Sequence, residues 1–318
     1  MMKLRDVFQA HNRIKPFIRK TPLEYSWMLS NLSRKQVFLK LENYQLTNSF
    51  KVRGVFNKLL KRRKELANRE IITASAGNHG LAIAYASHML GIKAKIVIPE
   101  KAPDIIIERI RQLNSNLILH GKTYDEAETY AKMLAEKEKL VYISPYNDLD
   151  VIEGHATIGL EILLDNPDID TILVPVGGGG LISGVAFVSK TIDSDIKIIG
   201  VQTEASPSMY YSIKKGRIVD VELKPSIVGG LHGNIEKNSI TFDFVKKYVD
   251  KIVLVSEDEI KSAVSFSIQK LGMMIEGSAA VTIAALLKYP VKLGEKICLI
   301  ISGGNLDTEI LSNIIRNE

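Results

Sequence analysis

The sequence predicts an α/β protein built from parallel sheets that are covered by helices. Two observations support this fold class. Short runs of β-branched and aliphatic residues alternate with longer amphipathic segments over most of the 318 residues, as in chains that fold into β-α-β units. The alternation also falls into two blocks, one at about 70–145 and one from about 170 onward. We therefore expect two α/β lobes with a ligand between them, at the carboxyl ends of the strands.

Each predicted strand is a short apolar run bounded by polar or turn-forming residues. The strands cover 37–42, 71–75, 94–98, 117–120, 140–144, 171–176, 196–202, 251–255 and 296–301. The predicted helices have apolar residues at helical spacing and cover 78–90, 104–113, 123–138, 152–164, 257–271 and 278–288. An amphipathic helix is also expected at the N-terminus, from the spacing of Leu4, Val7, Phe8, Ile14 and Ile18.

Composition and charge narrow the classes of function. Hydrophobic residues make up 46% and charged residues 25% of the chain, which is typical of a globular protein. No apolar stretch is long enough to span a bilayer. The net charge is 42 − 36 = +6, and the densest basic run, 61–64, lacks interleaved aromatics and is better explained as a solvated helix end than as a nucleic-acid site. We expect neither a membrane nor a nucleic acid as a partner.

The chain has one cysteine, Cys298, inside the predicted strand 296–301. A single cysteine excludes an intrachain disulfide and favours a reducing compartment. We therefore expect Cys298 to pack in the core and the protein to be cytoplasmic.

Lys51 lies where a polar loop leads from the first predicted strand into a helix that begins near Ser49. The N-terminal end of a helix is the positive end of its dipole, so this position disfavours protonation of the lysine. Schiff-base chemistry needs a lysine whose pKa is lowered in this way. Taken alone, however, the segment is better explained by a surface lysine on an amphipathic helix.

A second polar segment, 73–80, joins a predicted strand to a helix. The backbone N–H groups at this helix start, together with Ser75, Asn78 and His79, are suited to bind an anion such as an amino-acid carboxylate. A plain turn with Asn78 as the helix cap explains the segment equally well. A metal at His79 is not expected, because no second ligand lies nearby at helical or turn spacing.

Four consecutive glycines, Gly177, Gly178, Gly179 and Gly180, follow a predicted strand and precede a helix. Such a run lets the backbone curl around a phosphate at the helix N-terminus. The dinucleotide fingerprint fails, because Ile182 and Ser183 stand where it needs its last glycine, and a Walker loop fails because Val185 replaces lysine. The segment therefore predicts a site for a single phosphate.

A fourth segment, 301–305, closes the last predicted strand. It places the Ser302 hydroxyl at a carboxyl end, where a cofactor is expected. Alone, it is better explained as a turn.

Together the four segments resemble the fold-type II family of enzymes that use pyridoxal 5′-phosphate (PLP), and within it the branch of threonine (serine) dehydratases and serine racemases. The resemblance runs from about 21 to 305 and rests on the order of the motifs Ser-Phe-Lys-x-Arg-Gly, Ala-Gly-Asn-His-Gly, Gly-Gly-Gly-Gly-Leu and Ser-Gly-Gly-Asn. It implies two open, twisted, mostly parallel sheets with helices on both faces. PLP would lie between a large domain, 1–68 and 148–318, and a small domain, 69–147.

The resemblance also implies roles for individual residues. Lys51 forms the Schiff base with PLP and then removes the Cα proton of the substrate. Phe50 lies beside the cofactor, and Asn78 binds its 3′-oxygen. The remaining roles are phosphate binding by Gly177, Gly178, Gly179 and Gly180, contact of Ser302 with the pyridine nitrogen, and binding of the substrate carboxylate by Ser75, Asn78 and His79.

Two departures from the family pattern refine the expected activity. Serine racemases carry a second catalytic serine where this chain has Ala76, so elimination is favoured over racemisation. The racemase metal site places acidic residues near positions where this chain has Gln202, Ser206 and Ser208, although Glu204 is available, and we expect no metal.

The glycine-rich segment 229–235 is either a ligand-facing loop or a simple turn.

The expected protein is thus an ammonia-lyase that converts L-threonine, L-serine or a related β-hydroxy amino acid to a 2-oxo acid and ammonia. Racemisation or β-replacement on the same fold, and a non-catalytic sensor of amino acids or PLP, are the alternatives. The family implies a homo-oligomer, either a dimer or a tetramer.

Overall fold

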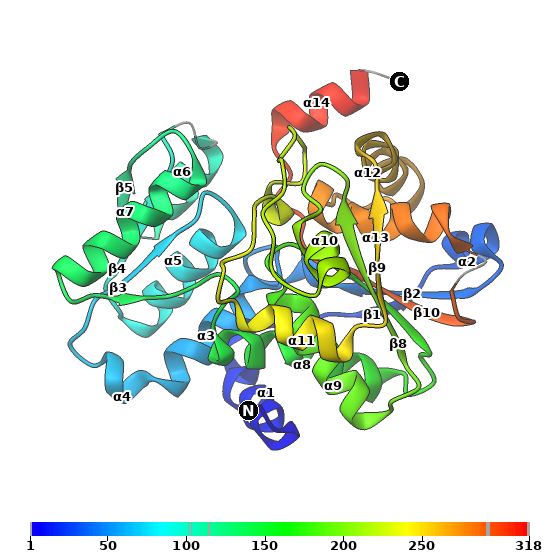
Figure 1. Ribbon diagram of the computed structural model, residues 1–318, viewed down its shortest axis with the longest axis horizontal. Coiled ribbons are helices and arrows are strands. Elements are labelled where there is room, and N and C mark those ends of the chain that lie inside the picture. The colour runs from blue at the N-terminus through cyan, green and yellow to red at the C-terminus, as the bar shows by residue number, and fades with distance from the viewer. Residues whose placement is uncertain (1, 101, 103, 114, 291–292, 317–318) are drawn as a thin grey trace.

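The computed structural model describes residues 2–100, 102, 104–113, 115–290 and 293–316, and it contains two separate sheets (Figure 1). The larger sheet has six strands in the order β1-β2-β10-β7-β8-β9. Its strands are β1 (Leu23–Tyr25), β2 (Gln36–Leu41), β7 (Thr171–Pro175), β8 (Lys197–Thr203), β9 (Lys251–Val255) and β10 (Lys296–Ile301). All neighbours pair in parallel except the edge strand β1, which runs antiparallel to β2.

The smaller sheet has four parallel strands in the order β5-β4-β3-β6. Its strands are β3 (Ile71–Ala74), β4 (Ala94–Ile98), β5 (Asn116–Leu119) and β6 (Val141–Tyr142), and its helices are α5 (Asn78–Leu90), α6 (Asp104–Gln112) and α7 (Tyr124–Lys137). In Figure 1 this unit lies to the left of the larger sheet. All of these elements fall within 69–147, while the domain boundaries themselves stay a prediction.

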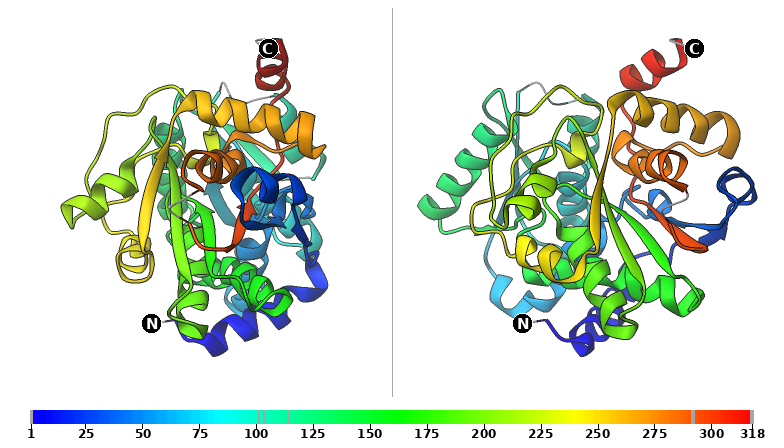
Figure 2. Two further views of the ribbon diagram at one scale, coloured as in Figure 1. Left: turned by 90° about the vertical axis from the view of Figure 1, so that its right-hand side faces the viewer. Right: turned by 45° about the vertical axis from the view of Figure 1, so that its right-hand side comes forward.

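Helices cover both faces of the larger sheet (Figures 1 and 2). One face packs on α2 (Trp27–Ser33), α12 (Glu257–Leu271) and α13 (Gly277–Lys288), and the other on α8 (Leu149–Asp165), α9 (Gly180–Ile192), α10 (Ser208–Lys215) and α11 (Ile240–Tyr248). Successive strand residues point to opposite faces: Leu299 packs with the first group of helices and Cys298 with the second. The α/β fold with two mostly parallel sheets is thereby confirmed.

The remaining helices are α1 (Leu4–Ile14), α3 (Lys51–Lys61), α4 (Arg63–Leu66) and α14 (Thr308–Arg316), with short 3-10 turns at Lys15–Phe17, Glu42–Tyr44 and Gly229–Leu231. The basic run 61–64 spans the junction of α3 and α4, where Lys61 and Arg62 form ion pairs with Asp150 of 2.8 and 2.7 Å. Cys298 is fully buried, and burial raises the pKa of its thiol to about 12, so its predicted packing role is confirmed. Within the described ranges no helix combines the length and apolar character needed to cross a bilayer.

Helices α3 and α8 cross with their backbones in contact, and this crossing positions the candidate site. A methyl group added at Gly54 would lie 2.5 Å from Nε2 of His155, and one added at Gly154 would lie 2.5 Å from the carbonyl oxygen of Arg53. Only glycine allows this approach at both positions. The first turn of α3, which carries Lys51, is therefore held against the middle of α8.

Candidate active site

Lys51 is the first residue of α3, so the helix begins two residues later than the predicted start near Ser49. Its Nζ donates a 2.8 Å hydrogen bond to the carbonyl oxygen of Pro145 and lies 5.2 Å from the ring centroid of Phe50. Burial lowers the pKa of the amine to about 8, against an opposing effect of the Glu276 carboxylate. Lys51 is therefore not an exposed surface lysine. With this pKa, part of the amine is unprotonated near neutral pH and can react as a nucleophile or a base.

Asn78 begins α5 and connects two residues from the far end of the chain. Its Nδ2 donates to Oε1 of Glu276 at 2.7 Å, and its Oδ1 accepts a 2.7 Å hydrogen bond from Nδ2 of Asn305. Gly77, and not Asn78, occupies the cap position of this helix. Burial raises the pKa of Glu276 to about 7, although the hydrogen bond from Asn78 lowers it. Neither Glu276 nor Asn305 was among the predicted site residues.

Two buried histidines lie beside Lys51. His79 places Nε2 3.4 Å from the carbonyl oxygen of Ile143, and its Nδ1 has no hydrogen-bond partner among the described residues. Burial and then the charge of Lys51 lower its pKa to about 3. His155 packs edge-on against Phe50 with ring centroids 4.8 Å apart, and burial followed by Lys51 lowers its pKa well below the usual value. Both rings are neutral at physiological pH and surround the amine with a poorly solvated environment.

Ser75 is buried just after β3, and its Oγ accepts a 3.3 Å hydrogen bond from the backbone N–H of Gly77. This places Ser75 at the same helix start as Asn78 and His79. The three side chains share a location suited to a carboxylate, while their role in substrate binding stays a prediction.

The glycine loop, Gly177–Gly180, leads from β7 into the 13-residue helix α9. Side chains are excluded from it: a methyl group at Gly177 would lie 2.9 Å from Cα of Leu231, and one at Gly178 would lie 2.5 Å from the Tyr146 ring. Gly179 has a φ of +90°, which favours glycine.

This loop fits a phosphate group. The first N–H groups of a helix lack partners within it and carry the positive end of its dipole. In the same turn of α9, the buried Ser183 hydroxyl has no hydrogen-bond partner among the described residues. The Oγ1 of Thr241 braces the loop from outside by donating to the Gly178 carbonyl oxygen at 2.6 Å. The residues present therefore suit the phosphate of a cofactor such as PLP.

Ser302 is buried at the carboxyl end of β10, as expected. Its carbonyl oxygen accepts a 3.1 Å hydrogen bond from the backbone N–H of Phe50, and Ser49 forms a β-bridge with Gly303. A methyl group at Gly303 would lie 2.5 Å from Oε1 of Glu276. The end of β10 is thus joined both to the start of α3 and to the Asn78–Glu276 pair.

The segment 229–235 packs against the glycine loop through Leu231 and is held in place by Ser206 and Ser208, whose hydroxyls donate to the Gly233 carbonyl oxygen at 3.3 and 3.0 Å. The Oε1 of Gln202 accepts from the Tyr210 N–H at 3.0 Å. Ser206 and Ser208 therefore anchor the segment 229–235, while Gln202 is bonded to helix α10. In the part of the chain that is described, no group of three or more histidine, cysteine, aspartate or glutamate residues is arranged to hold a metal.

Residues 14–303 match the family of pyridoxal-phosphate dependent enzymes. The chain therefore belongs to this family, its cofactor is PLP, and the resemblance to its fold-type II members is confirmed.

Individual relatives narrow the branch. The chain is 43% identical to an L-threonine ammonia-lyase of Thermotoga maritima over 316 residues, which are 99% of this chain and 78% of that protein. Maize serine racemase is 31% identical with a TM-score of 0.92, covering 99% of this chain and 97% of that one. The processed form of threonine deaminase isoform 2 from Solanum lycopersicum is 35% identical with a TM-score of 0.91, covering 99% and 94%.

Proposed function

We propose that this protein is an ammonia-lyase that removes the β-hydroxyl of L-threonine, L-serine or a related β-hydroxy amino acid, giving a 2-oxo acid and ammonia. The observation that carries the proposal is the position of Lys51. Its amine donates to the Pro145 carbonyl oxygen and lies over the Phe50 ring, and its pKa is lowered to about 8. Polar groups suited to a carboxylate and to a phosphate lie at the starts of α5 and α9. The similarity to a threonine ammonia-lyase supports the choice of reaction.

PLP supplies the electron sink that stabilises negative charge at Cα. The residues of this chain bind the cofactor and the substrate and orient them. The glycine loop and the N-terminus of α9 would hold the phosphate of PLP, and Ser302 and Asn78 would contact its ring. The start of α5, with Ser75, Asn78 and His79, binds the substrate carboxylate. Phe50, His79 and His155 exclude water around Lys51.

Lys51 carries the proton transfer. Its Nζ accepts the proton of the Cα–H bond and passes it to the β-hydroxyl, which departs as water as the Cβ–O bond breaks. The unsaturated amine that remains is released and hydrolyses to the 2-oxo acid and ammonia. The lowered pKa matches this task, because a base works best when its pKa lies near the working pH.

Racemisation is the second candidate, and the similarity to maize serine racemase favours it. Racemisation needs an acid on the face of the substrate opposite Lys51. The resemblance implies that serine racemases supply this acid from a serine at the position of Ala76, and the methyl group of alanine cannot donate a proton. Elimination needs no such acid, and this difference favours the lyase. β-Replacement and a non-catalytic sensor have no specific observation in their favour.

The test is an assay of 2-oxo acid and ammonia over L-threonine, L-serine and their D-enantiomers. We expect turnover with L-threonine or L-serine, with inversion much slower than elimination. Lys51→Ala should abolish turnover, while Lys64→Ala, at an exposed position on α4, should retain it. A Lys51→Ala protein that kept its turnover would contradict the proposal, and inversion without 2-oxo acid would point to a racemase.

We also propose that the protein works in the cytoplasm as a homodimer or homotetramer. The single cysteine supports the reducing compartment, and the family supports the assembly. Light scattering of the purified holoenzyme tests the assembly, and a monomeric mass would contradict it.

A further inference from the structure

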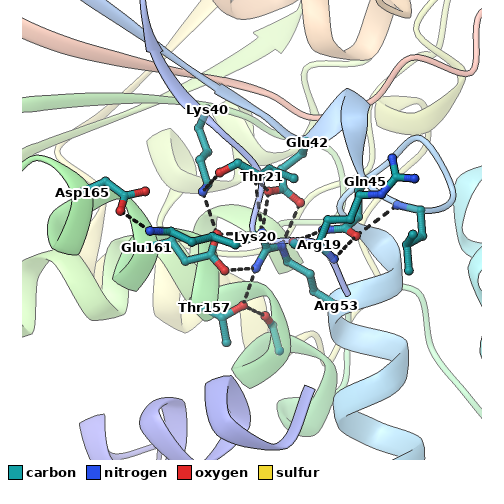
Figure 3. Close-up of polar contacts among 12 residues, drawn as sticks. Arg19, Lys20, Thr21, Lys40, Glu42, Gln45, Arg53, Thr157, Glu161 and Asp165 are labelled. Atoms are coloured by element: carbon teal, nitrogen blue, oxygen red, sulfur yellow. Dashed lines mark hydrogen bonds and ion pairs between the residues drawn. The ribbon is translucent and has the colours of Figure 1, made fainter. Parts of the chain in front are cut away.

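A cluster of buried charges lies beside the first turn of α3 (Figure 3). We call it the Arg53 cluster. It consists of Arg53, Lys40, Glu42, Glu161, Thr21 and Thr157, each of which is at most 1% exposed. Two cations face two carboxylates, so the formal charges balance.

Arg53 uses both edges of its guanidinium group. Its Nε and Nη2 donate to the two oxygens of Glu42, each at 2.8 Å. Its Nη1 and Nη2 donate to the two oxygens of Glu161 at 2.7 and 2.9 Å. The carboxylates raise the pKa of Arg53 although burial alone would lower it. Two bidentate contacts fix both the position and the plane of the guanidinium group.

The other members tie the cluster to further segments. Lys40 donates to Oε2 of Glu161 at 2.6 Å and to the carbonyl oxygen of Thr21 at 2.7 Å. The hydroxyl of Thr21 donates to Glu42, and Nη1 of Arg53 donates to Oγ1 of Thr157 at 3.2 Å. The cluster therefore joins the chain before β1, the end of β2 and helices α3 and α8.

The ion pair between Glu42 and Arg53 closes the base of the loop that carries the candidate catalytic residues. Phe50 and Lys51 lie between these two residues, which are 11 positions apart. On an α-helix, side chains two positions apart are rotated by about 200° about the helix axis and so point to nearly opposite sides. Arg53 can therefore face the cluster while Lys51 faces the site, and the orientation of one side chain determines the orientation of the other.

A gain in folding stability does not by itself explain why the chain buries the charges of the Arg53 cluster. Buried ion pairs often contribute little net stability, because burying the charges costs about as much as their attraction returns. They do impose a geometry, since an unpaired charge in the core is strongly disfavoured.

We propose that Arg53 is a positioning residue for Lys51. Its two bidentate ion pairs fix the rotation of α3 about its axis, and this rotation sets where Nζ of Lys51 points. A rotation of about 10° moves the end of a lysine side chain by roughly 1 Å, and a displacement of that size costs on the order of 100-fold in rate. The inference rests on the catalytic role proposed for Lys51.

Two variants of the full-length holoenzyme separate geometry from charge. Arg53→Lys keeps the charge and removes the fork, and the double variant Arg53→Met/Glu42→Gln removes one charge of each sign, so the core stays neutral. Lys20→Ala is the matched control, because Lys20 pairs with Asp165 next to the cluster but is itself exposed. For each protein, kcat, KM, the melting temperature and the circular dichroism of the bound PLP in its visible absorption band are measured.

We expect a 10- to 100-fold loss of kcat in both variants, with KM changed less than about threefold, and an altered dichroism per bound PLP. A purely structural role would lower the melting temperature and leave the kcat of folded enzyme and the dichroism unchanged. If either variant folds, binds PLP and keeps both kcat and the dichroism per bound PLP within twofold of the wild type, the inference is overturned. If Lys51→Ala also remains active, the proposed function fails as well, so the two failures are distinguishable.

Discussion

Lys51 and Glu276 are two groups of opposite charge whose pKa values both move toward neutrality, to about 8 and about 7. Burial is the main cause in both cases, because it disfavours the charged form of each group. Their mutual attraction opposes this effect. The unprotonated fraction of Lys51 near neutral pH is therefore set by a balance in which Glu276 favours the protonated amine.

Replacing Glu276 by glutamine is expected to lower the pKa of Lys51 further, because the carboxylate that raises it is removed. The unprotonated fraction increases as the pH rises through the pKa, so the pH midpoint for PLP uptake by the apoprotein should move to lower pH. Absorbance-monitored mixing of apoprotein with PLP measures this midpoint. Glu65→Gln, at an exposed position, is the control. A midpoint that stays or moves upward would show that Glu276 does not act on Lys51.

His155 is expected to make the apoprotein sensitive to acid. Its pKa in the folded protein lies well below the usual 6.5, so the unfolded chain binds more protons in the range between the two values. Stability should therefore fall as the pH drops below about 6.5, by up to about 1.4 kcal/mol per pH unit for one group. Urea unfolding at pH 6 and pH 5 should show a shallower loss for His155→Gln. The exposed-site variant His88→Gln should behave like the wild type.

Helix α8 differs from an ordinary surface helix, since its residues 150–163 are all buried. It packs on α3 through Gly154, on α9 opposite Gly184, and on the Arg53 cluster through Glu161. The sequence predicts this helix over 152–164. In the structure it begins at Leu149, because Asp148 caps it by accepting a hydrogen bond from the N–H of Asp150.

Gly154→Ala is expected to force α3 and α8 apart, because the added methyl group would lie 2.5 Å from the Arg53 carbonyl oxygen and 2.6 Å from Cα of Gly54. Such overpacking costs about 1–3 kcal/mol. Gly159→Ala on the same helix is the matched comparison, because its nearest contact would be 3.2 Å and alanine favours the helix by up to about 1 kcal/mol. Urea unfolding measures the free energy of unfolding of both variants. Equal stabilities of the two variants would contradict the close crossing.

Gly178→Ala tests the glycine loop as a phosphate site. Its methyl group would meet the Tyr146 ring, so the loop or the ring must move. We expect the affinity for PLP to fall about tenfold or more, which corresponds to about 1.4 kcal/mol, while the affinity for pyridoxal, which lacks the phosphate, changes little. Fluorescence titration of the apoprotein with both compounds distinguishes them. Gly229→Ala, whose methyl group would have no atom within 4 Å, is the control, and equal losses for both compounds would argue against a phosphate contact at this loop.

At the level of the whole molecule, the sequence predicted the features that are local in the chain. Short apolar runs bounded by polar or turn-forming residues identified nine strands, and the three-residue edge strand β1 was missed because it is too short to form such a run. The segments around Lys51, Asn78 and the glycine loop were found because each is a short run at a helix start.

Residues whose importance arises from distant contacts were missed. Glu276 meets Asn78 across 198 positions, and Arg53 meets Glu161 across 108 positions. Tyr146 packs on Gly178 from another part of the chain. No periodicity signals these pairings. The only local sign of Glu276 is a carboxylate directly before the start of α13, among apolar neighbours.

The strand order of the larger sheet also determines when the protein can fold. Strand β2 lies between β1 and β10, and the parallel register joins Gln36 to Lys296. During synthesis, therefore, the second strand of this sheet waits unpaired on one side until nearly the whole chain has been made. Lys40, in that strand, likewise waits for its partner Glu161. Contacts so distant in sequence fold slowly, and we expect the newly made N-terminal segment to need protection from aggregation until the last strand arrives.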